Sequence, residues 1–229
     1  MELVITGDGS HTLYIPELNE HYHSTFGAVT ESMHVFIKAG LGFLSNKRQV
    51  TVFEVGFGTG LNALLTCMAA IEQKSSFTYY AIEKNPLDIE VAGKLNYTPI
   101  LSHRLNSQTL FLAIHQAPWN KTSIINPYFQ LHKIHGSLIG FLPDFTYDVI
   151  FFDAFSPEKQ PEMWTPEIFK KLYLNLNPGG VLTTYCVKGA VKRMLKDAGF
   201  VIEKLPGPPG KREMLRGVKK TQRLATNGV

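Results

Sequence analysis

The sequence is poor in cysteine, has no long apolar run and shows no secretory signal. Two cysteines, Cys67 and Cys186, occur in 229 residues, too few for a disulfide framework or a cysteine-based zinc site. No apolar run approaches the ~18 residues that a membrane-spanning helix needs, and residues 1–10 lack a basic region followed by an apolar one. The eight histidines show no metal-ligand spacing. These absences predict a cytoplasmic protein in a reducing compartment, with no membrane partner and no metal.

The charge is distributed unevenly along the chain. Residues 188–223 contain eleven Lys or Arg and three acids, a net charge of +8, whereas the rest of the chain carries −4. A basic segment of this kind suits a polyanionic partner, because Lys and Arg neutralise phosphates. A solvated basic surface without a partner is the alternative, and the charge alone does not separate the two.

The pattern of apolar residues predicts strands that alternate with helices. Buried strands are expected at 51–56, 77–83, 147–155, 181–186 and 199–205, and helices at 61–73, 105–118, 166–175 and 188–198. We expect another helix to start at Pro86, strand pairing across a turn at Asn126-Pro127, and a turn at 177–180. Residues 212–219 form a last, antiparallel strand. This order predicts an α/β fold, a doubly wound and mostly parallel sheet with ligands bound beyond the carboxyl ends of its strands.

Three alternating glycines directly follow the strand predicted at 51–56. Gly56, Gly58 and Gly60 leave backbone N–H groups able to meet a ligand at a helix start. Leu61 stands where the dinucleotide fingerprint G-x-G-x-x-G requires glycine. Glu83 ends the next predicted strand, where a carboxylate can accept both hydroxyls of a ribose. The pattern favours a nucleoside cofactor over the alternative, a tight turn with a surface glutamate.

Asp153 ends the most apolar strand, in the run VIFFDAFSP at 149–157. A carboxylate there faces the ligand site and has an apolar wall behind it, which strengthens its field. Capping of the following turn is the alternative. Asp148, at the other end of the same strand, is expected to be an ordinary solvated acid.

The sequence resembles a known family at several separate motifs. The E-x-G-x-G-x-G pattern resembles motif I of class I S-adenosylmethionine (SAM) methyltransferases. FEVGFGTGLNALLT, YDVIFFDAFSPEKQPEMWTPEIFKKL and GPPGKREMLRGVK together resemble the methyltransferase domain of MnmC-type tRNA-modifying enzymes. The resemblance implies a Rossmann-like domain at 51–220, an N-terminal extension at 1–50 packed on it and a disordered tail at 221–229. It also implies a SAM site made by these residues: Glu54, Gly56, Gly58, Gly60, Glu83, Ser137 (where relatives often place an acid) and Asp153.

The resemblance further implies an activity. The family domain uses SAM to methylate the exocyclic amine of 5-aminomethyl-2-thiouridine at the tRNA wobble position. Relatives fuse it to an FAD-dependent oxidase, for which this chain has no room, so a stand-alone enzyme without FAD is expected. A separate enzyme then supplies the aminomethyl uridine. Two rival functions remain: an aminopropyltransferase of the spermidine-synthase type, and an RNA-binding module that has lost catalysis.

Roles for single residues follow from this chemistry. A free alkyl amine has a pKa near ~10.4, so presenting it neutral at pH ~7.4 costs about 4 kcal/mol. An Asp153 with an ordinary carboxylate pKa is a poor base for that proton, so its expected catalytic role is to accept an N–H and stabilise the developing positive charge. Phe155 and Trp164 stack on the splayed base, or pack in the core instead. The remaining substrate candidates are the lid residues Tyr22 and Glu31 and the phosphate-binding Lys211, Arg212 and Arg216, extended by Lys188 and Lys192.

Overall fold

The computed structural model describes residues 1–101 and 106–221. All of the expected tail except Thr221 therefore lies outside the described residues. The described chain builds a small N-terminal sheet and a large central sheet.

The central sheet has eight strands in the order β10-β11-β9-β8-β4-β5-β7-β6. Its five inner strands pair in parallel: β4 (Gln49–Val55), β5 (Ser76–Glu83), β7 (Phe129–His135), β8 (Tyr147–Phe152) and β9 (Leu176–Thr184). Three strands pair antiparallel at the edges: β6 (Thr122–Asn126), β10 (Val201–Pro206) and β11 (Glu213–Val218). The mostly parallel α/β fold and the antiparallel last strand are confirmed.

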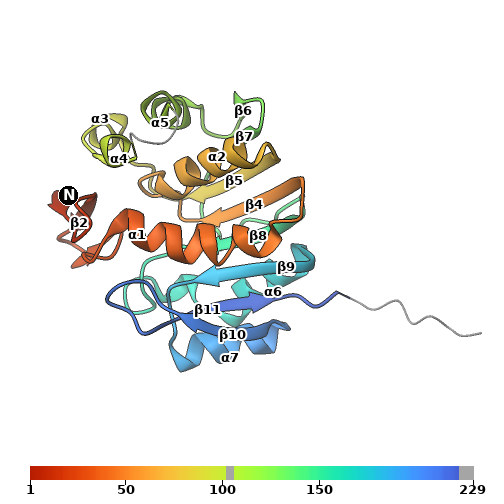
Figure 1. Ribbon diagram of the computed structural model, residues 1–229. Coiled ribbons are helices and arrows are strands. Elements are labelled where there is room, and N and C mark those ends of the chain that lie inside the picture. Colours follow the sequence, from red (N-terminus) through yellow and green to blue (C-terminus); the bar gives the residue numbers. More distant parts are fainter. Residues whose placement is uncertain (102–105, 222–229) are drawn as a thin grey trace, which may run out of the picture.

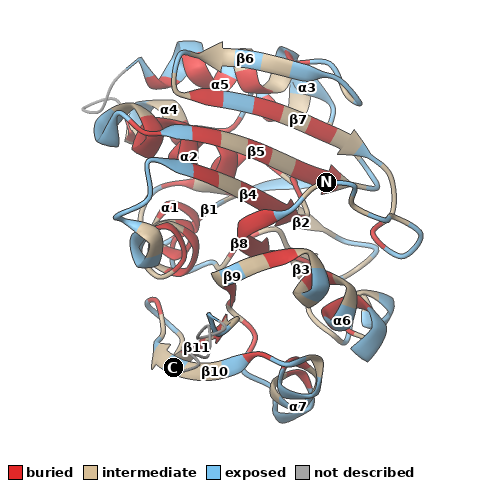
Figure 2. Cartoon of the chain, turned by 90° about the vertical axis from the view of Figure 1, so that its right-hand side faces the viewer, coloured by how far each residue is buried: buried red, intermediate tan, exposed pale blue. Residues whose placement is uncertain are grey.

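Helices cover both faces of this sheet (Figure 1). On one face, Val52 and Phe151 pack under α1 (Ala28–Ser32), its π-helical continuation Met33–Lys38, α2 (Leu61–Gln73) and α5 (Ser107–Gln116). On the other face, Phe53 and Phe152 pack under α6 (Pro166–Asn175) and α7 (Gly189–Ala198). Strands β4 and β9 are buried along most of their length, β5 and β7 alternate between buried and more exposed residues (Figure 2), and β8 is buried at every residue. This explains why β8 is a nearly continuous apolar run.

The N-terminal residues form a three-stranded antiparallel sheet of β1 (Glu2–Ile5), β2 (His11–Ile15) and β3 (Glu20–His21). Asp8, in the turn between β1 and β2, accepts hydrogen bonds from the backbone N–H and the hydroxyl of Thr30. These bonds fix the small sheet to α1. The chain then crosses above the carboxyl ends of the central strands, through residues 20–26.

Residues 177–180 interrupt the pairing of β9 with β8, which runs from Tyr147–Leu176 to Val149–Val181, and Gly179 is left-handed there with a φ of +78°, although these residues lie within the bounds of β9. One element prediction is wrong in detail. The helix expected at Pro86 is the single turn α3 (Ile89–Ala92), which starts at Asp88, whose carboxylate accepts the N–H of Glu90. A second short helix, α4 (Tyr97–Ile100), follows.

Asp148 is also not the solvated acid that the sequence predicts. Its carboxyl group is buried, forms an ion pair with Lys47 at 2.6 Å, and accepts hydrogen bonds from the Thr51 N–H and the Asn177 amide. These partners come from β4, β9 and the segment before β4. Asp148 is therefore a structural residue that joins the amino-terminal ends of neighbouring strands.

Candidate active site

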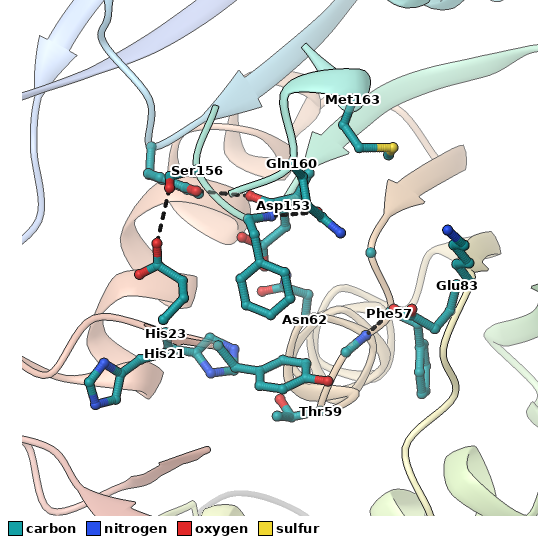
Figure 3. A pocket seen from close by; sticks show the side chains of 18 of the residues that line it. His21, His23, Phe57, Thr59, Asn62, Glu83, Asp153, Ser156, Gln160 and Met163 are labelled. Atoms are coloured by element: carbon teal, nitrogen blue, oxygen red, sulfur yellow. Dashed lines mark hydrogen bonds between the residues drawn. The ribbon is translucent and has the colours of Figure 1, made fainter. Parts of the chain in front are cut away.

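A pocket of about 390 Å³ lies beyond the carboxyl ends of the parallel strands. Its walls are the loops that follow β4, β5, β7, β8 and β9, together with residues 20–26. The strand order reverses at β4, whose neighbours are β5 on one side and β8 on the other. Doubly wound sheets bind ligands at such a reversal. Figure 3 shows side chains from these loops around the same space.

The glycine loop after β4 forms the floor of the pocket. Gly56 has a φ of +90°, and a Cβ there would lie 2.7 Å from the backbone oxygen of Asp153. Gly58 has a φ of +49°, and a Cβ there would lie 3.1 Å from the Tyr22 ring. The glycines therefore permit both the left-handed backbone and the close approach of the loops after β4 and β8.

Glu83 and Ser137 lie on the β5 and β7 side of the pocket. The Glu83 carboxylate accepts the N–H of Gly58 at 3.1 Å and the N–H of Asn85 at 2.8 Å (Figure 3). Burial raises the pKa of Glu83, and these backbone hydrogen bonds oppose the increase. Ser137 lines the pocket, and its hydroxyl accepts the N–H of Ile139. Each Glu83 oxygen keeps a lone pair for a further donor.

Asp153 lies at the opposite side, directly after β8. The Asn62 amide, from the first turn of α2, donates to its carboxylate at 2.9 Å (Figure 3). Burial and the charge of Glu31 raise the pKa of Asp153 to about 7, while Asn62 and Lys211 oppose this increase. The ordinary carboxylate pKa assumed from the sequence is therefore wrong, because the sequence shows neither how deeply the Asp153 carboxyl group is buried nor that Glu31 lies near it. Asn62 was missed, although it follows Gly60 by only two residues.

Glu31 and Lys211 meet at the rim of the pocket and form an ion pair. The Glu31 carboxylate also accepts the Ser24 N–H at 2.8 Å, and the Lys211 ammonium lies 4.2 Å from the centre of the Tyr185 ring. The Tyr185 hydroxyl donates to the backbone oxygen of Ala154 at 2.8 Å, in the loop that follows β8. Tyr185 was missed, since nothing in its sequence neighbourhood distinguishes it from a strand residue.

The two aromatic candidates have different surroundings. Phe155 lines the pocket, and its ring meets the edge of Tyr22 at a centroid distance of 5.2 Å. Trp164 is buried against Phe152 and Phe169 and does not line the pocket. Its indole N–H donates to the Phe155 backbone oxygen at 2.8 Å. Trp164 is therefore a core residue, as the alternative expectation has it, and its hydrogen bond fixes the backbone of Phe155.

Four other candidates lie outside the pocket lining: Glu54, Gly60, Arg212 and Arg216. Gly60 caps α2, and a Cβ there would lie 2.8 Å from the His115 ring. Glu54, within β4, is fully buried, and its carboxyl group has no hydrogen-bond partner among the described residues. Burial raises its pKa well above the ordinary value. Arg216 forms an ion pair with Glu203 at 2.7 Å, and its guanidinium lies 4.4 Å from the Phe43 ring centre. Arg212 is exposed beside a neighbouring groove.

The pocket is acidic although the whole chain is basic. Five carboxylates line it: Glu20, Glu31, Glu83, Asp153 and Glu162. Such a lining favours cationic or hydrogen-bond-donating ligands. Over 1–101 and 106–221, no group of His, Cys, Asp and Glu is arranged to hold a metal ion. In the same ranges, no helix is both long and apolar enough to span a bilayer.

Comparisons with known sequences identify close relatives. Residues 130–220 match a family described as S-adenosyl-L-methionine-dependent methyltransferase. The chain is 32% identical over 231 residues to the tRNA 5-methylaminomethyl-2-thiouridine biosynthesis bifunctional protein MnmC of Burkholderia thailandensis, covering 94% of this chain and 34% of that protein. The protein of the same name from Burkholderia mallei is also 32% identical, over 235 residues, with 94% and 35% covered. The chain thus spans about a third of the length of these curated relatives.

Solved structures show the same fold. The structure of MNMC2 from Aquifex aeolicus superposes with a TM-score of 0.79 at 24% identity, covering 96% of this chain and 70% of that one. Spermidine synthase from Thermotoga maritima superposes with a TM-score of 0.52 at 13% identity, with 92% and 69% covered.

Proposed function

The chain belongs to the MnmC-type, SAM-dependent methyltransferases, and from this premise we propose that it methylates the exocyclic amine of 5-aminomethyl-2-thiouridine at the tRNA wobble position. The observation that carries the proposal is the Asp153 carboxylate, placed beside the glycine loop in an acid-lined pocket. The bifunctional relatives are named for biosynthesis of the 5-methylaminomethyl-2-thiouridine of tRNA. The amine that would become methylated there is basic, and the pocket presents carboxylates to it.

The residues of the pocket fit SAM. The loop Gly56–Gly58 offers a close backbone approach, and the two Glu83 oxygens retain acceptor capacity for the ribose hydroxyls. Ser137, on the same side, is placed to contact the adenine. When bound, SAM supplies an electrophilic methyl group on a positively charged sulfur. We assign Gly56, Gly58, Glu83 and Ser137 to holding it.

Asp153 has two tasks in this mechanism. It accepts an N–H of the substrate amine and so directs the nitrogen lone pair toward the methyl group. Methyl transfer would break the methyl–sulfur bond of SAM as the N–C bond forms, leaving a neutral thioether and a positive nitrogen, and one N–H proton of that nitrogen would then pass to the carboxylate. With a pKa of about 7, roughly half of the Asp153 side chains are ionised near neutral pH and able to take that proton. Asn62 keeps one carboxylate oxygen in place and leaves the other for the amine.

The rim of the pocket supplies contacts for the base. Phe155 and Tyr22 present aromatic surface to the pocket, and Glu31 adds a carboxylate held by Lys211. Unpaired RNA bases are commonly held by such aromatic surfaces. The basic C-terminal segment then contacts the tRNA backbone, with Lys188 and Arg212 as exposed residues in the groove beside the site. A separate reaction has to supply the primary amine on C5 of the uridine.

An aminopropyltransferase is not favoured. The acidic lining also suits a polyamine, but the likeness to spermidine synthase is a likeness of fold at 13% identity, whereas the likeness to MnmC proteins reaches 32% over nearly the whole chain.

The proposal is tested with an RNA anticodon stem-loop that carries 5-aminomethyl-2-thiouridine at the wobble position. We expect incubation with SAM to add one methyl group to that nucleoside, measured by mass spectrometry after digestion. A matched loop with 2-thiouridine, which lacks the amine, is expected to stay unmodified. If SAM binds but neither loop gains a methyl group, the proposed function is wrong.

A further inference from the structure

A second, open groove of about 420 Å³ adjoins the reaction pocket. It shares Ser156, Tyr185 and Lys211 with that pocket, so the two spaces meet at these residues. Ser156, which Figure 3 shows at the edge of the reaction pocket, donates its hydroxyl hydrogen to Glu20. The groove is otherwise lined by Pro157, Cys186, Val187, Lys188, Arg212 and Glu213.

The groove combines an apolar floor with a cationic rim. Pro157 and Cys186 contribute apolar surface, and Val187 is 40% exposed to solvent there. Lys188 and Arg212 lie on the rim. The two acids nearby form ion pairs with lysines: Glu213 with Lys204, and Glu158 with Lys188.

The guanidinium of Arg212 is the cation whose charge is least offset. It is exposed and forms no ion pair with an acid in the described part of the chain. Apolar surface next to such a cation suits a planar base attached to a phosphate.

We propose that this groove binds the nucleotide adjacent to the one that enters the reaction pocket. The proposal rests on the proposed function. A target nucleoside whose C5 substituent reaches Asp153 is splayed out of its loop, and its neighbour in the strand then lies at the mouth of the pocket, where the groove begins. The neighbouring base lies on Pro157 and Val187, and its phosphate faces Lys188 and Arg212. Extruded bases are held against aromatic or apolar side chains, and cations follow the backbone of a single strand.

The test is a double-mutant cycle between protein and RNA. On the protein, Val187→Glu places a carboxylate in the groove. Val201→Glu is the matched control, because Val201 is 41% exposed, lies on β10, lines neither space and gives the same change of net charge. On the RNA, the anticodon stem-loop carries an abasic nucleotide on the 5′ or the 3′ side of the modified uridine. Equilibrium binding is measured for every pair, with SAM affinity as a check of folding.

For the wild type, we expect one of the two abasic loops to bind about tenfold more weakly than the complete loop, because a seated base is lost. Val187→Glu should bind the complete loop about tenfold more weakly than Val201→Glu does. For the abasic loop that lacks the seated base, the two variants should have nearly the same affinity. If both abasic loops bind the wild type as tightly as the complete loop, or if the two Glu variants behave alike, the groove is not a nucleotide site. If the wild type neither binds nor methylates the complete loop, the proposed function itself fails, and this inference fails with it.

Discussion

The carboxyl group of Asp153 lies among groups that shift its pKa in opposite directions. Burial and Glu31 raise it, and the Asn62 amide and the Lys211 ammonium lower it. A carboxyl group with a raised pKa is protonated below that pKa, so the proposed proton acceptor is lost as the pH falls through about 7. The methylation rate is therefore expected to rise with pH across this range.

Replacing Asn62 tests this arrangement. Asn62→Ala removes the N–H that stabilises the charged carboxylate, so the pKa of Asp153 should rise and the rising limb of the pH–rate profile should move to higher pH. At pH ~7 the loss of one such hydrogen bond corresponds to an about tenfold lower rate. Single-turnover methylation between about pH 6 and 9 measures both. Asn126→Ala, which removes an amide bonded to Cys67 away from the pocket, should leave the profile in place. An equal loss at every pH for Asn62→Ala contradicts the assignment.

Some site residues can be predicted from the sequence and others cannot. Asp153 directly follows β8 and Glu83 is the last residue of β5, and the carboxyl ends of such parallel strands share one edge of a sheet. Asp148 and Arg216 could not be placed, because their partners are distant in sequence: Lys47 for Asp148, and Glu203 and Phe43 for Arg216. A side chain's charge does not show whether a partner lies beside it in the fold.

The glycine loop after β4 leaves little room for side chains at its glycine positions. Gly58 is left-handed, donates its N–H to Glu83, and has Tyr22 where a Cβ would be. Gly58→Val forces a strained backbone and moves these neighbours. We expect SAM affinity to fall about tenfold or more, as measured by calorimetric titration.

Gly140→Val is the control for that variant. A Cβ at Gly140 meets nothing within 4 Å, and Gly140 does not line the pocket. It should keep the affinity of the wild type. If Gly58→Val remains folded and binds SAM normally, SAM does not bind against this loop.

The sequence predicts whether a segment is a helix or a strand better than it predicts the residues at which that element begins and ends. Helix α2, capped by Gly60, and helix α6, capped by Thr165, begin where their sequence signals place them. Residues 177–180 contain Pro178 and two glycines, and the pairing of β9 with β8 is interrupted over them. They still lie within the bounds of β9, and Gly179 and Gly180 form backbone hydrogen bonds with Lys219, a partner that the turn-forming residues alone do not reveal.

Over the whole molecule, an acidic pocket lies within a basic chain. This separation suits a substrate with a cationic group to be buried and a polyanionic backbone to be held outside. The cations of the basic segment differ in their surroundings. Arg216 forms an ion pair with Glu203 and donates a hydrogen bond to the Ala39 carbonyl, whereas Arg212 is exposed.

The two arginines should therefore affect RNA binding differently. Arg212→Gln is expected to weaken binding of the anticodon stem-loop and to reduce the slope of log Kd against log salt by about 1. Arg216→Gln should leave the slope unchanged and lower the Tm instead, since it removes packing and an ion pair. Equal slopes for wild type and Arg212→Gln mean that this surface faces away from the RNA.

The most direct test of the account is a comparison of the wild type with Asp153→Asn in single-turnover methylation of the aminomethyl loop, together with a SAM titration. Asparagine keeps the shape of the side chain but can neither take the proton nor stabilise the charge on nitrogen. The account predicts a rate lower by about 10²–10³ and nearly unchanged SAM affinity, because it assigns the cofactor contacts to Glu83 and the glycine loop and not to the Asp153 carboxylate. A rate within about threefold of the wild type, or a parallel loss of SAM binding, contradicts the role of Asp153 as the residue that handles the amine.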